Sequence, residues 1–400
     1  MLFSPKGRLG LMSLKHYACC SDRKLVEQLN GNLEYQFFCD IALGDKRIEN
    51  YKIVSQIRCE LADHLDIDST EKVFYEHWSD FITSANQATT DATCYESELR
   101  YPTVQKLLWE ATSWLYNQLR KTCRILGTKM VRSKYLKWKR RYHSFSKMRR
   151  KTNKNRVSLT RALLRLLKKF IGFEKQLRKS HDLTFTVRYY RRVATIKKIY
   201  EQQEEHFRTG ERIKDRIVSI SKDYIRPIVR GKEVRPVEFG AKVNKVQIDG
   251  INFMEHISFN AFNEGTRLQS TVYKIQNLTK RKLKILGADA IYATNKNRNF
   301  VTRHGIKTDF KRKGKLPKDY ADEKKLKAQI TKERASRLEG SFGKEKEHYH
   351  LKKIKAKIKK TEILWIFFGI HTANALEIGR RMHANLNQKY PPHQPHIDFH

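Results

Sequence analysis

The stretch KLKILGADAIY, residues 282–292, carries the clearest strand signal in the chain. An apolar run leads into Gly287 and Ala288, and Asp289 stands where the run ends. A short run of this kind is typical of a buried strand. In α/β proteins, strand ends bring side chains from distant parts of the sequence into one cleft. Asp289 is therefore a candidate functional residue.

The sequence on both sides of this strand predicts an α/β domain. Residues 236–248 and 251–259 have β-branched runs broken by Pro, Gly and an Asp-Gly pair, which predict two strands. An amphipathic helix follows over 263–281, with Leu268, Val272, Ile275 and Leu278 on its inner side. After the buried strand we expect a short helix (294–305), a short strand (306–312), a long charged helix (323–351) and a final helix reaching Met382. Strands alternating with helices favour a mixed sheet covered by helices.

The remaining sequence is predicted to be helical, and its pattern predicts how the chain is divided into domains. Ser21 is a predicted N-cap, and residues 104–127 form a strong amphipathic helix. Leu108, Leu115, Leu119 and Leu126 are among the apolar positions of that helix. We predict a helical N-terminal domain (1–80), a core in two pieces (81–103 and 216–382), a basic helical insertion (104–215) and a loose C-terminal tail (383–400).

The charge balance points to a polyanionic partner. The 400 residues include 83 Lys and Arg against 42 Asp and Glu, a formal net charge of +41. Nucleic acid is the leading candidate, an anionic membrane surface is second, and a ribosomal role is third. Between Glu110 and Glu174 there are 20 Lys and Arg and no acid. Such a block repels itself unless it is solvated or bound to a polyanion.

Within that block, aromatic residues alternate with charges over residues 134–151, KYLKWKRRYHSFSKMRRK. We expect the aromatic residues to pack in a core and the cations to contact DNA phosphates. The aromatic residues are Tyr135, Trp138, Tyr142 and Phe145. The predicted DNA-binding cations are Lys137, Lys139, Arg140, Arg141, Arg149 and Arg150.

Other classes are disfavoured. The longest apolar run, residues 363–370, is far shorter than the roughly 20 residues of a membrane span. The first ten residues show no secretory signal. The six cysteines form no CxxC pair or finger spacing, which favours free thiols in a reducing cytosol over a zinc site.

Three carboxylates stand out as a possible metal site: Asp91, Asp289 and Glu339. Clustered carboxylates repel one another, and a divalent cation such as Mg²⁺ removes that cost. Two such ions support phosphoryl transfer. Around Glu339, helical spacing places the small residues Ala335, Ser336 and Gly343 and the cation Lys346 on one face. A duplex backbone could then approach the carboxylate. Leu326, Ile330, Leu338 and Phe342 form the adjacent stripe, which we expect to anchor the helix to the sheet.

The order of these motifs resembles the DDE-class transposases of bacterial insertion sequences. DATCYESELRYPT (91–103) resembles the first-aspartate motif, GADAIYATNKNRNFVTRHGI (287–306) the second-aspartate strand with its helix, and RLEGSFGKEK (337–346) the glutamate helix. Residues 6–38 are similar to an InsH-like N-terminal transposase domain. Two departures are visible. The stretch before Asp91 is polar, and the arginine of the family signature would fall at Ala335, with Arg334 and Arg337 near but out of register.

The resemblance implies an RNase H-like α/β core in which Asp91, Asp289 and Glu339 hold two Mg²⁺ or Mn²⁺ ions. It further implies that Lys346 contacts DNA and that the N-terminal domain and basic insertion bind terminal inverted repeats. The expected enzyme cleaves DNA at element ends and transfers the strand to target DNA. It would act as a homodimer or larger multimer in the bacterial cytoplasm, associated with the nucleoid and not with membrane. The alternative is a catalytically inactive DNA-binding protein, either a decayed transposase or an architectural factor.

Overall fold

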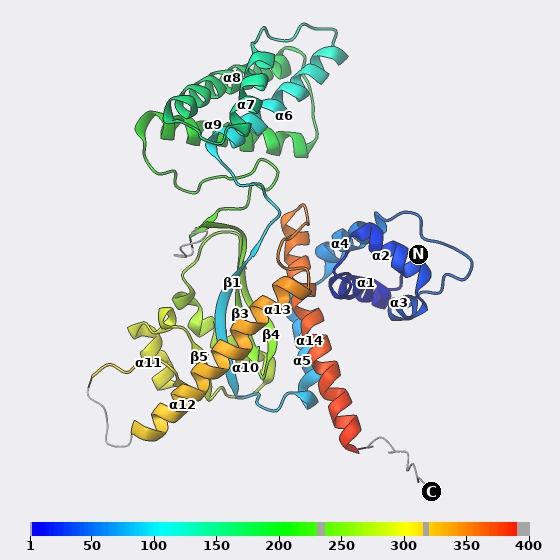
Figure 1. Cartoon of the computed structure of the whole chain (residues 1–400), viewed down its shortest axis with the longest axis vertical. Helices are drawn as coiled ribbons and strands as arrows, with labels where there is room; N and C mark the ends of the chain where they lie inside the picture. Colours follow the sequence, from blue (N-terminus) through cyan, green and yellow to red (C-terminus); the bar gives the residue numbers. More distant parts are fainter. Residues whose placement is uncertain (1, 230–236, 315–319, 390–400) are drawn as a thin grey trace. The chain divides into compact units, whose positions relative to one another are not determined.

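The computed structural model describes residues 2–229, 237–314 and 320–389 (Figure 1). Its contacts divide the chain into two compact units. The first consists of residues 1–98 and 240–400, and the second of residues 99–239. In the sequence, the second unit is thus one continuous segment that separates the two segments of the first unit. The predicted insertion, 104–215, falls inside it.

The first unit is built on a mixed sheet in which β1 (Gln87–Glu96) has neighbours of both directions. It pairs antiparallel with β3 (Val237–Ile248) and parallel with β5 (Ile285–Ala288). Beyond these, β4 (Ile251–Ser258) is antiparallel to β3, and β6 (Lys307–Thr308) is parallel to β5. The strand order is therefore β4-β3-β1-β5-β6. β2 (Pro227–Val229) pairs antiparallel with the first residues of β3. Every strand predicted on either side of the 282–292 stretch is present.

One face of the sheet carries the main apolar core. Ala88, Val246, Phe253 and Leu286 from the strands pack with the inner side of α10 (Leu268–Thr279). The four residues predicted for the inner side of that helix are all buried. The 3₁₀ turns η2 (Glu264–Arg267) and η3 (Ala290–Tyr292) and helix α11 (Asn295–Arg303) complete this layer.

The opposite face of the sheet is crossed by the long charged helix predicted at 323–351. It consists of α12 (Tyr320–Glu333), a π-helical turn (Arg334–Leu338) and α13 (Glu339–His348). In Figure 1 these three segments form one long orange helix that passes over β1 and β3. Of the predicted anchoring stripe, Ile330 and Leu338 are buried. The interruption by a π-turn is the feature that regular helical periodicity does not predict.

The N-terminal region is helical, as predicted, and packs against the last helix of the chain, α14 (Lys359–Lys389). Ser21 caps α2 by accepting a hydrogen bond from the Lys24 backbone N–H. The helices are α1 (Pro5–Tyr17), α2 (Asp22–Gly31), α3 (Leu33–Phe38), α4 (Ile53–His64) and α5 (Ile67–Trp78), followed by the 3₁₀ turn η1 (Ser79–Phe81). Since α14 continues to Lys389, residues 383–389 of the predicted loose tail are helical, and the rest of that tail lies outside the described residues.

The second unit is a helical bundle with its own apolar core. It comprises α6 (Val104–Ile125), α7 (Tyr135–Lys147), α8 (Asn153–Ser180) and α9 (Val187–Thr209). Leu108, Leu115 and Leu119 of α6 are buried, as their spacing predicts. Tyr135 and Phe145 are buried in the same core, and Trp138 and Tyr142 pack against it. The aromatic residues of the basic stretch therefore serve the core.

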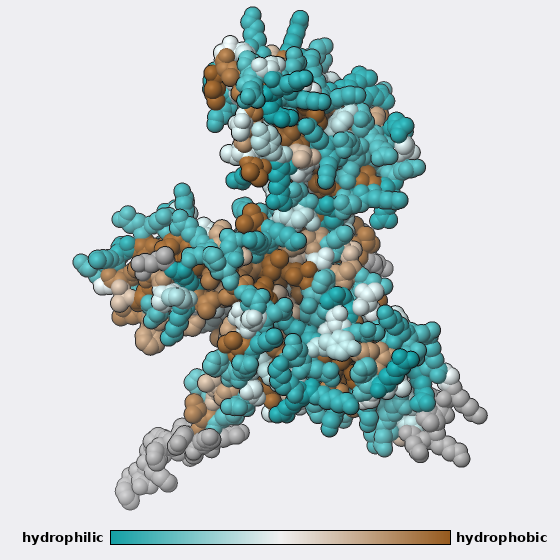
Figure 2. Space-filling model, turned by 180° about the vertical axis from the view of Figure 1, so that it is seen from behind, coloured by the Kyte–Doolittle hydropathy of each residue, from teal (hydrophilic) through white to brown (hydrophobic). Residues whose placement is uncertain are grey.

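The face of the molecule in Figure 2 is mostly hydrophilic, as the composition requires. None of the helices in the described part of the chain has the length and apolar content needed to cross a bilayer.

Candidate active site

Two of the three candidate carboxylates come from neighbouring parallel strands, with Asp91 inside β1 and Asp289 directly after β5. In the β1–β5 pairing, Thr90 stands opposite Ala288. Asp91 and Asp289 are the next residues of their chains. The polar stretch before Asp91 does form a strand, because only one of its faces enters the apolar core. Successive side chains alternate between the two faces, so Asp91 shares its face with Thr89 and Thr93.

The helix that carries Glu339 lies close to these strands because β5 contains a glycine. A Cβ atom added to Gly287 would lie 2.7 Å from Cγ2 of Ile330 on α12 and 3.0 Å from Cγ2 of Thr89 on β1. The first distance is too short for a real side chain, and the second would require Thr89 to move. Gly287, in the stretch that identifies the buried strand, therefore lets α12 approach the sheet directly beside the two aspartates.

The π-turn then determines which side chains face the aspartates. Its closing hydrogen bond runs from the Glu339 N–H to the Arg334 carbonyl, five residues back. In a regular α-helix, side chains four residues apart are neighbours, whereas those five apart point to different sides. The extra residue of the π-turn thus places Arg334 beside Glu339. The resemblance expects an arginine at position 335, but this chain has its arginine at position 334. The extra residue in the π-turn compensates for that shift of one position.

Arg334 is the centre on which the acids converge. Its Nη1 lies 3.5 Å from Oε1 of Glu339, and its Nη2 lies 4.0 Å from Oδ1 of Asp289. Its positive charge also lowers the pKa of Asp91, against larger effects that raise it. Three acids separated by as many as 248 positions (91 to 339) are therefore gathered around one guanidinium group.

A fourth carboxylate, Asp309, belongs to the same group and was missed by the sequence analysis. It follows β6 directly, and its Oδ2 lies 3.7 Å from Nε of Arg334. Its Oδ1 accepts a hydrogen bond of 3.0 Å from the Ala288 N–H, so it also ties β6 to β5. The available signal was its position within the predicted short strand 306–312, the next strand along the chain after the one that ends at Asp289.

The electrostatics of the group reflect an excess of negative charge. Burial raises the pKa of Asp91 to about 6, and Glu264 and Asp289 contribute in the same direction. A hydrogen bond of 2.7 Å from the Ala92 N–H opposes this rise. Burial likewise raises the pKa of Asp309. A site in which carboxyl groups resist ionisation is one in which additional positive charge would be stabilising.

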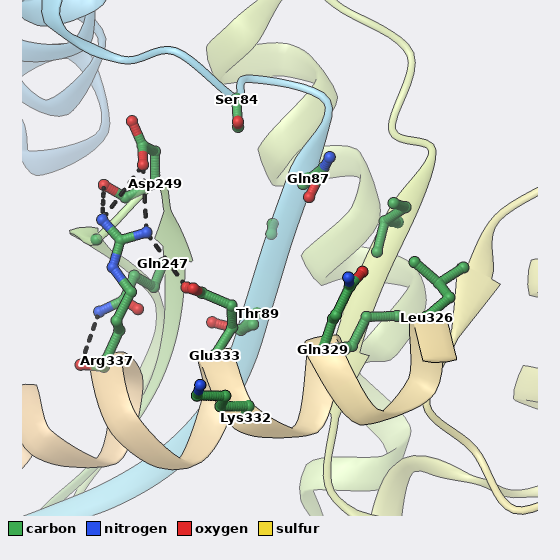
Figure 3. A pocket seen from close by; sticks show the side chains of 14 residues that line it. Ser84, Gln87, Thr89, Gln247, Asp249, Leu326, Gln329, Lys332, Glu333 and Arg337 are labelled. Atoms are coloured by element: carbon green, nitrogen blue, oxygen red, sulfur yellow. Dashed lines mark hydrogen bonds and ion pairs between the residues drawn. The ribbon is translucent and has the colours of Figure 1, made fainter. Parts of the chain in front are cut away.

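Arg337, the other arginine near the signature position, has a different role. Figure 3 shows it reaching from the π-turn to Asp249 in the β3–β4 turn. Its Nη1 and Nη2 each lie 3.3 Å from Asp249 Oδ1, and its backbone carbonyl accepts a 3.3 Å hydrogen bond from Gln247. These contacts line a pocket of about 400 Å³ between the start of β1 and α12. Arg337 therefore fixes the π-turn to the sheet.

A buried ion pair fixes α13 in the same way. Lys245 Nζ lies 2.6 Å from Glu345 Oε1, and both side chains are inaccessible to solvent. Tyr95 and Asn252 donate further hydrogen bonds to Glu345. Lys346, the next residue, is half-buried and donates a 3.0 Å hydrogen bond to Thr93 Oγ1. It therefore lies on the same face of β1 as Asp91, two residues further along.

The space above Glu339 is open. The side chains of Asp289 and Glu339 are 53% and 51% exposed. Ala335, Ser336 and Gly343 are exposed, and a Cβ atom added to Gly343 would meet nothing within 4 Å. No packing in the described structure accounts for this glycine.

The chemistry of the site fits a divalent cation, since its donors are carboxylate oxygens, the ligands that Mg²⁺ and Mn²⁺ prefer. The buried Nε of Arg334 has no hydrogen-bond partner within the described structure, so its contacts with the acids are electrostatic. Within residues 2–229, 237–314 and 320–389, no three Asp, Glu, His or Cys side chains are spaced so that they could hold one metal ion. Arg334 stands among the acids instead.

The predicted DNA-binding cations of the second unit are all exposed on or near α7. Arg141 donates a 2.9 Å hydrogen bond to Ser158 on α8, and its guanidinium lies 5.2 Å from the centre of the Trp138 ring. These cations are therefore available to solvent while the neighbouring aromatic residues hold the bundle together.

The three candidate carboxylates thus come from the middle of β1, from the residue that follows β5, and from the helix that crosses the sheet. Residues 286–370 match the family model described as a transposase DDE domain. This segment, which contains Asp289, Asp309, Arg334 and Glu339, is thus similar to the DDE domain of transposases. Asp91 and the N-terminal region lie outside the match. No curated protein and no solved structure matches the chain.

Proposed function

We propose that this protein cleaves DNA at the ends of a mobile element and joins the freed strand to target DNA. The observation that carries the proposal is the convergence of Asp91, Asp289 and Glu339 around Arg334. The strand order β4-β3-β1-β5-β6, with three antiparallel strands followed by two parallel ones, supports an RNase H-like core.

In this proposal Asp91, Asp289 and Glu339 hold two divalent cations, Mg²⁺ or Mn²⁺. Two such ions would activate a water molecule or a 3′ hydroxyl and stabilise the leaving oxygen of the phosphodiester. First, water attacks the phosphodiester at the element end and releases a 3′ hydroxyl. That hydroxyl then attacks a phosphodiester of the target strand, so the number of phosphodiester bonds is conserved in the second step. Neither step requires an oxidant or a nucleotide cofactor.

The surrounding residues position the DNA. Lys346 would bind a phosphate beside the reacting one, because it lies on the same face of β1 as Asp91. The open surface at Gly343 would admit the duplex backbone close to Glu339. Helices α1–α5 and the basic second unit would bind the terminal inverted repeats. We further propose that the protein acts as a homodimer or larger multimer on paired ends, in the bacterial cytoplasm with the nucleoid.

The test is strand cleavage by the purified full-length protein in Mn²⁺ or Mg²⁺. The substrate is a labelled duplex that carries the genomic sequence flanking the gene, where short inverted repeats are expected. Glu339→Gln should reduce cleavage to background while leaving DNA affinity within about twofold. Glu347→Gln is the matched control, since Glu347 is an exposed glutamate of the same helix and pairs with Lys352. Cleavage by Glu339→Gln at the wild-type rate would refute the assignment.

A non-catalytic DNA-binding protein is the second candidate. The contact between Arg334 and the carboxylates favours it, because a guanidinium neutralises the cluster without a metal ion. The same experiment separates the two functions. Tight binding of the flanking duplex with no cleavage in either metal would favour the non-catalytic protein.

A further inference from the structure

A hollow on the second unit is surrounded by cations that the sequence analysis did not select. It has a volume of about 760 Å³ and lies between the segment preceding α7, the first turn of α7 and one face of α8. Its charged lining residues are Arg132, Lys134, Arg161, Arg165 and Lys169, and no acid is among the lining residues. We call it the α8 groove.

The spacing of the charges along α8 is regular. Arg161, Arg165 and Lys169 are four residues apart, so they form one stripe on the helix, with successive charges about 6 Å apart along the axis. All three side chains are exposed. The opposite side of the helix, with Leu163 and Leu167, is buried in the core, so the helix cannot turn this stripe away from solvent.

These cations lack local neutralisation. None of the five forms an ion pair with an acid in the part of the chain that the structure describes. Like charges at i and i+4 destabilise a helix by a few tenths of a kcal/mol per pair. A stripe of unpaired cations therefore opposes the stability of α8 unless a polyanion binds there.

The wall of the groove contains an aromatic side chain whose position is fixed. Trp138 packs against the core of the unit, and Arg141, hydrogen-bonded to Ser158, covers its ring. The floor is formed in part by Ala162 and Leu166. Rigid apolar walls with cations along the rim are suited to an extended phosphodiester backbone, in which phosphates alternate with less polar sugars.

We infer that the α8 groove binds the phosphate backbone of duplex DNA, and that it does so more strongly than the cations of α7. The inference rests on the proposed function only for the choice of DNA as the polyanion. It assigns sequence-independent contacts, because phosphate contacts position a protein without reading bases. Arg161, Arg165 and Lys169 are the principal contacts.

The test compares two triple variants of the full-length protein. Arg161→Gln/Arg165→Gln/Lys169→Gln removes the stripe, and Lys137→Gln/Lys139→Gln/Arg140→Gln removes the same charge from α7. Each protein is titrated with a fluorescent duplex of about 30 base pairs over a range of NaCl concentrations. Each lost phosphate contact reduces the slope of log K against log [NaCl] by about 0.9. For the variant that lacks Arg161, Arg165 and Lys169, the slope of log K against log [NaCl] should therefore decrease by about 2.7 in magnitude. For the α7 triple variant, the decrease should be less than half of that.

An equal or smaller loss in the groove triple than in the α7 triple would overturn the inference. Tighter binding of an RNA duplex of the same sequence would overturn the choice of DNA. Circular dichroism and the melting temperature of each variant show whether the bundle is intact, and a single Arg165→Lys substitution should retain the wild-type slope. The salt slopes decide the inference even if no cleavage is found, so its failure is distinguishable from failure of the proposed function.

Discussion

Arg334 and Glu339 are five residues apart, and the π-turn between them brings Nη1 of Arg334 to 3.5 Å from Oε1 of Glu339. π-turns are rare inside α-helices and are frequently found at functional sites. Here the turn has a definite effect, since it places a cation among acids contributed by β1, by the residues following β5 and β6, and by α13. Arg334 thereby neutralises a cluster whose members otherwise repel one another.

Replacing Arg334 by Gln should make the metal-free protein less stable and its response to metal larger. Without the guanidinium, four carboxylates remain close together and lose the positive charge that offsets their repulsion. A divalent cation would then bind more tightly, and tenfold tighter binding adds about 1.4 kcal/mol of stabilisation at saturating metal. Thermal unfolding with and without Mn²⁺ measures both effects.

Lys332→Gln is the control for this substitution. Lys332 is an exposed cation that lies two residues before Arg334, the first residue of the π-turn. It should change neither the melting temperature nor the Mn²⁺ shift. If Arg334→Gln behaves like Lys332→Gln, then Arg334 does not stand in for a metal ion in this site.

Much of the fold can be predicted from local sequence because hydrophobic periodicity and turn residues mark its elements. The 282–292 stretch, the strands on either side of Asp249-Gly250 and the inner face of α10 all follow from such patterns. Asp289 and Glu339 are also accessible to sequence reasoning, one at the end of an apolar strand and the other among small residues.

The remainder depends on contacts between distant segments. Asp91 lies in a polar stretch that becomes a strand only because β3 and β5 pair with it on both sides. Arg334 is misread because a π-turn shifts the helical register by one residue, and the hydrogen bond that closes the turn has no sequence signature. Asp309 joins the site through a β6 strand of two residues, which is too short to give a period-two signal.

Gly343→Ala tests whether Gly343 serves the close approach of DNA to α13 or the structure of the helix itself. Within α13 the substitution should stabilise the protein by up to about 1 kcal/mol, since glycine is a poor helix former and the added Cβ meets nothing within 4 Å. Cleavage of the flanking duplex should nevertheless decrease, because the methyl group occupies space that we assign to the DNA backbone. Urea unfolding and strand cleavage are measured on the same preparation.

Gly379→Ala in α14 is the matched control, because the Cβ added there also meets nothing within 4 Å. It should stabilise the protein without changing cleavage. Full activity of Gly343→Ala would show that DNA does not come close to α13 at this residue.

The buried pair Lys245 and Glu345 should behave as a structural unit. Glu345→Gln leaves the ammonium group of Lys245 buried without its carboxylate, a change that typically costs 3–5 kcal/mol. The double variant Glu345→Gln/Lys245→Met removes both charges and should recover more than half of the loss. Urea denaturation of the wild type, the two single variants Glu345→Gln and Lys245→Met, and the double variant gives the coupling energy. A double variant as unstable as the sum of the single variants would show that the two charges are not coupled.

The stability of the first unit should decrease below about pH 6.5 because of His16. This residue of α1 is buried, its Nδ1 lies 3.0 Å from the Tyr349 carbonyl oxygen, and burial lowers its pKa to about 3. The positive charges of Arg58 and Lys15 oppose its protonation, and so does His350 when it is itself protonated. In the unfolded chain a histidine has a pKa of about 6.5. Between these values the unfolded state binds a proton that the folded state excludes, so the free energy of unfolding falls as the pH falls, by at most about 1.4 kcal/mol per pH unit. Above pH 6.5 this dependence disappears.

His16→Asn removes the titrating group and retains a side-chain donor for the Tyr349 carbonyl. The slope of stability against pH between 4.5 and 6.5 should therefore be smaller in this variant than in the wild type, and the two should run parallel above pH 7. His77→Asn, an exposed position on α5, should leave the wild-type slope unchanged. Melting temperatures measured across this range supply the slopes. Parallel curves for His16→Asn and the wild type below pH 6.5 would mean that α1 separates from the core before His16 is protonated, and that the contact with Tyr349 does not hold the N-terminal helices against α13 and α14.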